Sequence, residues 1–116
     1  MRIAFGAVLL LHGIAHIVGF LRAWAPTRTT IVGNRIDLGA SRIRVVGLGW
    51  LLIAVAFGVA AVASLVGITG WPTFALVLTG VSLALCLLQL PETKIGVVLN
   101  VVLIAGLFYG QRAGWI

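Results

Sequence analysis

Four long runs of apolar side chains constrain this chain more than any other feature, and Arg44, at the start of the second run, is the one charged residue within them. They cover about 3–21, 43–66, 71–90 and 95–109. Each run has roughly 15 to 24 residues, close to the number that a helix needs to cross the hydrocarbon core of a bilayer. Lipid offers no partner for open strand edges, so each run should be helical. We therefore predict an all-α, integral membrane four-helix bundle that forms one transmembrane domain over residues 1–116.

The composition also favours lipid as the solvent of this chain. Hydrophobic residues make up 62% of the 116 residues and charged residues 9%, whereas soluble domains are about half apolar and a quarter charged. A soluble fold of this size could not hide so much apolar surface, because small domains bury the smallest fraction of their area. The single cysteine, Cys86, excludes an intrachain disulfide.

Basic residues predict the orientation of the bundle. The net charge is +6, and most Lys and Arg residues fall in the loops after the first and third spans, whereas the opposite side carries only Arg2 and Arg112. Lys and Arg mark cytoplasmic loops, so both termini should face out and the longer loop, about 25–42, should be cytoplasmic. The residues that we expect to contact anionic lipid headgroups are Arg22, Arg28, Arg35, Arg42 and Arg44.

The longer loop contains a pattern typical of a short β-hairpin. Residues 30–32 and 35–38 are largely apolar or β-branched and flank Gly33-Asn34, a turn signal weaker than Asn-Gly. A segment lying in the membrane interface explains the same residues equally well.

Two histidines are the most informative polar residues in the spans. His12 and His16 are separated by four residues and share one face of the first helix. His16 lies six residues before Arg22, and Asn100 lies six residues after Lys94. Both are therefore about 9 Å from the expected cytoplasmic edge, so a cluster that contains His16 and Asn100 is geometrically possible.

The histidines belong to a candidate cluster of buried polar side chains near the cytoplasmic end. Such a cluster has two interpretations: hydrogen bonds between helices that only stabilise the bundle, or a functional site, for which ionisable residues in a membrane are candidates. The members of the predicted cluster are His12, His16, Gln89, Glu92 and Asn100.

Several ligands of the histidine pair are conceivable, and the sequence assigns none. A metal needs further donors, and only Cys86, Asp37 and Glu92 are available. Two histidines one turn apart on one helix cannot hold opposite faces of one haem, although each can supply one axial ligand. Proton-coupled export, as in small multidrug exporters, would require the histidines to relay protons, because the spans contain no carboxylate.

Glycines indicate close packing between helices. Gly106 and Gly110 form a small-xxx-small pair, and Gly13 and Gly19 leave two positions of the first span without a side chain. Such positions allow helix backbones to approach closely. The partner helix is either within this bundle or in another subunit.

Two segments resemble the motifs of a family of small bacterial four-helix membrane proteins. Leu11–Phe20, LHGIAHIVGF, resembles a first helix that reads L-H-G-x-x-H-x-x-G-F. Glu92–Val102, ETKIGVVLNVV, is similar to the start of the family's last helix, although Ile95 replaces an aromatic residue and Val97 a threonine. The resemblance implies a four-helix fold in the bacterial cytoplasmic (inner) membrane and no particular activity. Gly96 lies in the second motif and joins the helix-packing glycines.

The function that we expect from the sequence is non-catalytic. The chain contains no phosphate-binding loop, nucleophile elbow or paired catalytic carboxylates. The first hypothesis is an accessory or assembly subunit of a larger membrane complex. The alternative is a ligand-binding or redox protein that uses His12 and His16 for a metal, haem or pigment. Expected partners are the lipid bilayer and other membrane subunits or further copies of the chain, and no nucleic acid.

Overall fold

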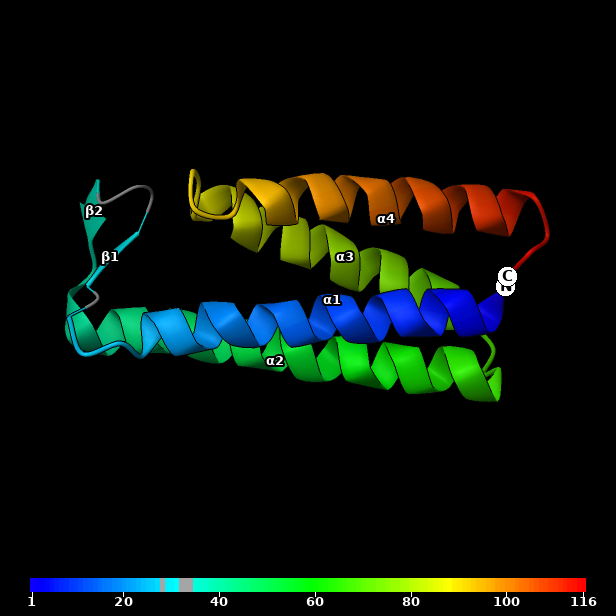
Figure 1. Cartoon of the computed structure of the whole chain (residues 1–116), viewed down its shortest axis with the longest axis horizontal. Coiled ribbons are helices and arrows are strands. Elements are labelled where there is room, and N and C mark those ends of the chain that lie inside the picture. Colours follow the sequence, from blue (N-terminus) through cyan, green and yellow to red (C-terminus); the bar gives the residue numbers. More distant parts are fainter. Residues whose placement is uncertain (28, 32–34) are drawn as a thin grey trace.

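Four helices account for most of the described chain (Figure 1). The computed structural model describes residues 1–27, 29–31 and 35–116. Within this part the predicted all-α fold is confirmed, with one short pair of strands in the long loop. The elements are α1 (Arg2–Ala23), β1 (Thr30–Ile31), β2 (Ile36–Asp37), α2 (Gly39–Val66), α3 (Trp71–Leu88) and α4 (Lys94–Arg112).

Local signals explain where the helices begin and end. The Asp37 carboxylate accepts a hydrogen bond of 2.9 Å from the Gly39 amide, so α2 begins before its apolar run. Gly67 ends α2 in the left-handed conformation, with φ of +76°, which glycine adopts without strain. Pro72 lies in the first turn of α3, where a missing N–H costs no helical hydrogen bond. Thr93 donates a hydrogen bond to the Cys86 carbonyl and ties the α3–α4 turn to the end of α3.

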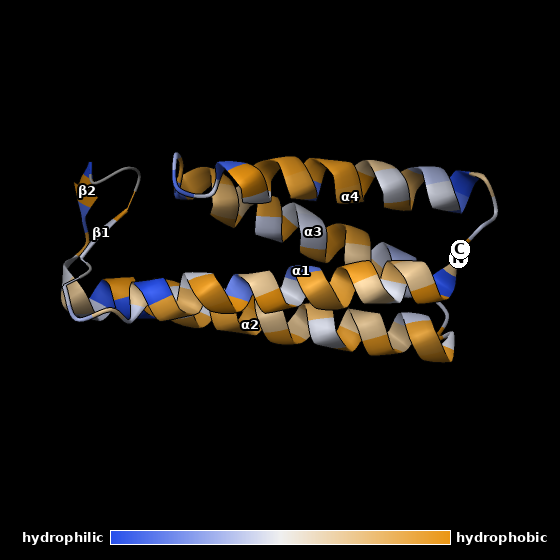
Figure 2. Cartoon of the chain, viewed as in Figure 1, coloured by the Kyte–Doolittle hydropathy of each residue, from blue (hydrophilic) through white to orange (hydrophobic). Residues whose placement is uncertain are grey.

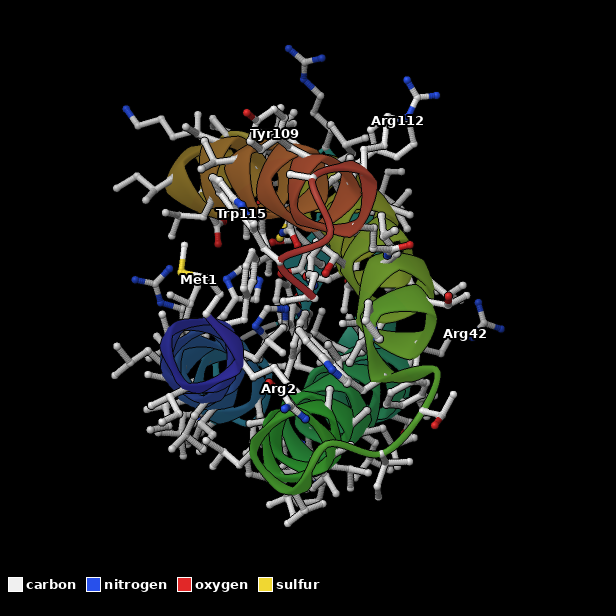
Figure 3. The ribbon with its side chains drawn as sticks, turned by 90° about the vertical axis from the view of Figure 1, so that its right-hand side faces the viewer. Met1, Arg2, Arg42, Tyr109, Arg112 and Trp115 are labelled. Atoms are coloured by element: carbon white, nitrogen blue, oxygen red, sulfur yellow. The ribbon has the colours of Figure 1, made fainter. Side chains whose placement is uncertain are left out.

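The helices form an arc with one open side. Helix α1 packs along α2, α2 contacts α3, and α3 packs along α4. Seen end-on in Figure 3, α1 and α4 therefore flank the side that is not closed by a helix–helix interface. Both termini lie at the same end of the molecule (Figure 1). The fully buried apolar side chains at the centre of the arc include Leu9, Phe57 and Leu107.

The outer surface of the helices is apolar. Leu52 is 70% exposed and Ile95 is 69% exposed. Figure 2 shows hydrophobic residues along the length of the helices and hydrophilic residues gathered at their ends. All four helices are long and apolar enough to cross a membrane, as a multi-pass membrane protein requires.

The strand pair lies at the end where most arginines are found. Strands β1 and β2 are antiparallel, with Thr30 opposite Asp37 and Ile31 opposite Ile36. This pairing supports the hairpin over an unpaired interfacial segment, although its predicted turn at Gly33-Asn34 lies outside the described residues. Arg28 also lies outside them, and the exposed arginines at this end include Arg22, Arg35, Arg42 and Arg44.

Candidate functional site

Two glycines of α1 bring the histidine-bearing helix directly against α2. A Cβ atom at Gly13 would lie 2.8 Å from Cβ of Phe57 and 3.0 Å from the carbonyl oxygen of Ala54. A Cβ atom at Gly19 would lie 2.5 Å from a ring carbon of Trp50. The two backbones can therefore approach only because these positions lack a side chain. This close contact sets the rotation of α1 and holds the His12 and His16 rings inside the arc.

The protein itself uses both ring nitrogens of His16. Its Nδ1 lies 2.9 Å from the carbonyl oxygen of His12, and its Nε2 lies 2.7 Å from Oγ of Ser82. A carbonyl oxygen can only accept, so Nδ1–H donates to it. In the neutral ring Nε2 is then the acceptor, and the Ser82 hydroxyl donates to it. His16 is 3% exposed and its hydrogen-bonding capacity is filled.

His12 differs because the protein uses only one of its ring nitrogens. Its Nε2 lies 3.2 Å from Oδ1 of Asn100. The amide of Asn100 is oriented by its nitrogen, which donates to the Gly96 carbonyl at 2.8 Å and to Sγ of Cys86 at 3.5 Å. Oδ1 must therefore accept from Nε2–H of His12. Within the described part of the chain, Nδ1 of His12 has no hydrogen-bond partner.

Aromatic rings surround the two imidazoles. The His12 ring lies 4.7 Å from the Phe57 ring, edge to face, and the His16 ring lies 5.1 Å from the Trp50 ring. The two imidazole centroids are 4.8 Å apart. The buried indole N–H of Trp50 has no hydrogen-bond partner among the described residues.

A cavity whose walls are mostly apolar but include several polar side chains adjoins the histidines, and we call it the polar cavity. It has a volume of about 170 Å³. Its walls include His12, His16 and Trp50, together with four polar or charged side chains near the end of the bundle. Those four residues are Arg22, Gln89, Glu92 and Thr93.

A second, apolar cavity runs along the open side of the arc. We call it the α1–α4 groove. It has a volume of about 420 Å³ and is lined by Phe5, Val8 and Leu11 of α1 and by Leu99, Val102 and Leu103 of α4. The groove and the polar cavity share three lining residues, so they adjoin each other. The shared residues are His12, Ala15 and Leu99.

Comparison with known proteins assigns no family to the chain. No family model, curated protein or solved structure matches it. The resemblance carried by Leu11–Phe20 and Glu92–Val102 therefore rests on those motifs alone.

Within the predicted cluster, the structure brings Asn100 to His12, one helical turn before His16, whereas His16 contacts Ser82. The equal depth of His16 and Asn100 followed from placing the end of α1 and the start of α4 at the same membrane edge, but α1 and α2 extend beyond the α3–α4 turn at this end (Figure 1). Gln89 is buried and Glu92 is exposed, and both line the polar cavity.

Sequence reasoning missed two members of the site. Ser82 is fully buried and contacts His16. Trp50 is the second, and its position inside an apolar span rather than at a span end was the available signal. Ser82 carried no comparable signal, because a hydroxyl in this helix does not by itself indicate a contact with another helix. Thr79 is equally buried, yet it donates within its own helix, to the Ala75 carbonyl at 2.6 Å.

The remaining glycines have different surroundings. A Cβ atom at Gly96 would lie 3.0 Å from Sγ of Cys86, so α3 and α4 approach closely there. At Gly110 the nearest atom is Cδ1 of Ile116 at 3.1 Å, in the chain's own C-terminal segment. At Gly106 it is a ring carbon of Phe5 at 3.8 Å, an ordinary contact across the open side.

The donor atoms of the site do not favour a metal. Among the described residues, no three His, Cys, Asp or Glu side chains lie close enough together to hold a metal ion. A haem iron commonly binds Nε2 of a histidine, and both Nε2 atoms here are hydrogen-bonded within the protein. Hydrogen bonding to a small organic group is the chemistry that this arrangement offers.

Proposed function

We propose that this chain is a non-catalytic, multi-pass protein of the bacterial cytoplasmic membrane that binds a lipid-soluble amphiphile between α1 and α4. The observation that carries the proposal is the junction of an apolar groove with a polar cavity at His12. Ligand sites typically combine mostly apolar walls with a few polar groups that fix orientation. Here the apolar walls would hold a hydrocarbon tail, and the polar cavity would hold a head group.

The location of the two cavities supports this amphiphile orientation. The polar cavity includes Arg22 and Glu92, at the end of the bundle that carries most of the arginines. The groove extends from Ala15 toward Phe5, away from that end. We propose that the arginine-rich end and the long loop are cytoplasmic and that both termini face out, because Lys and Arg concentrate in cytoplasmic loops. A bound amphiphile then has the direction of a lipid in the cytoplasmic leaflet.

A side chain that fills the junction tests the proposal. Ala15 lines both cavities, so Ala15→Phe should block the site, whereas Ala7→Phe places the same ring on the exposed surface of α1 outside both cavities. The probe is para-nonylphenol, added to the protein in lipid nanodiscs, with bound molecules counted by native mass spectrometry. The proposal predicts saturable binding by the wild type and by Ala7→Phe, and a loss of at least tenfold in Ala15→Phe. Equal uptake by all three proteins would refute it.

The open side also supports a second candidate function, an accessory or assembly subunit of a larger membrane complex. A transmembrane helix of another subunit, or of a second copy, would cover the groove, whose lining includes Gly106. Gentle purification followed by mass measurement of the intact assembly separates the two candidates. A stable complex whose cross-links map to α1 and α4 favours the subunit, and a monomer that carries a small molecule favours the ligand-binding protein.

A further inference from the structure

We propose that the head group of the ligand is a single hydroxylated ring, as in a lipid-soluble phenol, and that its hydroxyl donates a hydrogen bond to Nδ1 of His12. This inference rests on the proposed function, since it names the class of amphiphile that the same site would take. It concerns binding only and involves no reaction.

The hydrogen-bond network makes Nδ1 of His12 an acceptor. Asn100 presents its carbonyl oxygen to Nε2 because its amide nitrogen is already engaged by Gly96 and Cys86. A neutral imidazole has one donor and one acceptor nitrogen. Donation from Nε2 therefore leaves the lone pair on Nδ1. Apolar surroundings penalise the charged ring, in which both nitrogens would be donors.

This acceptor remains accessible within the site. In the described chain, the fully buried side-chain nitrogens that lack a hydrogen-bond partner are those of Trp50 and Gln111. Nδ1 of His12 also lacks a partner among the described residues but is not one of these fully buried nitrogens, so it retains some exposed surface and can be reached from the cavities. His12 also lines both the polar cavity and the groove. A ligand group placed at their junction would meet this nitrogen. A group that can donate is favoured there, because a buried acceptor without a partner costs free energy.

The size and walls of the polar cavity favour one ring. Its volume is about 170 Å³, and an apolar protein cavity of about 150 Å³ is known to hold one benzene molecule. The rings of His16 and Trp50 form part of its wall. Aromatic pairs of this kind prefer offset or edge-to-face contacts. A small ring therefore fits the cavity in both volume and chemistry.

The adjoining groove would hold an aliphatic tail attached to that ring. Its lining on α1 extends from Ala4 to Ala15, which corresponds to about 16 Å of helix. The groove side chains are almost entirely apolar, and they continue from the shared residues Ala15 and Leu99. A tail attached to the ring would pass beside Ala15 and Leu99 from the cavity into the groove.

A matched pair of probes tests the hydroxyl. Para-nonylphenol and its methyl ether have the same ring and tail, but only the phenol can donate a hydrogen bond. Binding of each to the wild-type protein in nanodiscs is measured by native mass spectrometry and corrected for partition into protein-free nanodiscs. We expect the phenol to bind about 3- to 10-fold more tightly, the ratio expected for one net hydrogen bond. This comparison requires no variant.

Two variants of His12 locate the preference on Nδ1. In His12→Gln the side-chain amide can still donate to Asn100 but places no acceptor where Nδ1 was, so the ratio of the two affinities should fall to about one. In His12→Asn the shorter amide oxygen can replace Nδ1, so a preference for the phenol should persist.

The outcomes separate this inference from the proposed function. Equal, saturable binding of the phenol and the ether to the wild type, blocked by Ala15→Phe, would overturn the hydrogen bond to His12 and leave the amphiphile site intact. No saturable binding of either probe would overturn both. A preference for the phenol that persists unchanged in His12→Gln would also overturn the assignment to Nδ1.

Discussion

Single residues in the buried cluster differ in how much of their hydrogen-bonding capacity the protein itself satisfies. His16 uses both ring nitrogens, through the His12 carbonyl and Ser82. His12 uses one, through Asn100. The first pattern is that of a structural residue, because buried polar groups are normally paired. The second leaves an acceptor for a ligand, which is why we assign the two histidines different roles.

The structural role of His16 predicts energetic coupling with Ser82. In a double-mutant cycle of His16→Leu and Ser82→Ala, we expect a coupling energy of about 0.6 kcal/mol and at most about 1.7 kcal/mol, the range for hydrogen bonds between membrane helices. The measurement is the free energy of unfolding in mixed micelles containing SDS. Ser64→Ala is the matched control, because Ser64 donates to the Arg2 carbonyl at 2.8 Å. Additive effects for His16 and Ser82 would contradict the bond.

The sequence identified the polar residues of the site better than their partners. His12, His16 and Asn100 were recognisable because each is polar within an apolar span. Which histidine meets Asn100 depends on the relative depth of α1 and α4, and the loops do not reveal that depth. Ser82 could not be selected, because its contact with His16 depends on the rotation of α3 about its axis.

Helix elements were predictable where charge, glycine or proline marks a boundary. Trp71-Pro72 opens α3 as expected, and Gly67 ends α2. Helix α2 begins at Gly39 rather than near Ile43, because the Asp37 carboxylate binds the first helical amide and the basic turn that follows is already helical. A hydrophobic run delimits only the part of a helix that contacts lipid. Helical turns outside that part contain polar residues and cannot be recognised from hydrophobicity.

Close contact between α1 and α2 predicts an asymmetric response to alanine. Gly13→Ala should destabilise the protein by about 1–3 kcal/mol, since its Cβ would lie 2.8 Å from Phe57 and overpack the interface. Gly58→Ala is the control on α2, because nothing lies within 4 Å of the position of its Cβ. Thermal unfolding in detergent measures both. Equal effects of the two substitutions would show that α1 and α2 are not packed as described.

At the scale of the whole molecule, the distribution of basic residues predicts its orientation in the membrane. In a Cys86→Ala background, Thr69→Cys places a thiol in the exposed turn between α2 and α3, and Ser41→Cys places one at the arginine-rich end. A membrane-impermeant maleimide added to intact cells should label Thr69→Cys and spare Ser41→Cys. The opposite labelling would reverse the orientation proposed here.

The arc of helices has an open side that the sequence did not predict. A four-helix bundle was expected from the four apolar runs, and such bundles commonly surround a shared core. Here α1 and α4 flank a groove instead. Apolar side chains face both lipid and the interior in a membrane protein, so hydrophobic patterns cannot distinguish a closed bundle from an open arc.

Photolabelling of the protein in nanodiscs tests the amphiphile site most directly. The probe is para-nonylphenol with a diazirine in its tail, and adducts are mapped to residues by peptide mass spectrometry. The account predicts adducts concentrated on groove residues such as Val8, Leu11 and Val102, which excess unlabelled para-nonylphenol suppresses. Leu52 and Val59 of α2 are exposed and lie outside the groove, so they report nonspecific labelling. Adducts spread evenly over both sets, without competition, would contradict the central claim.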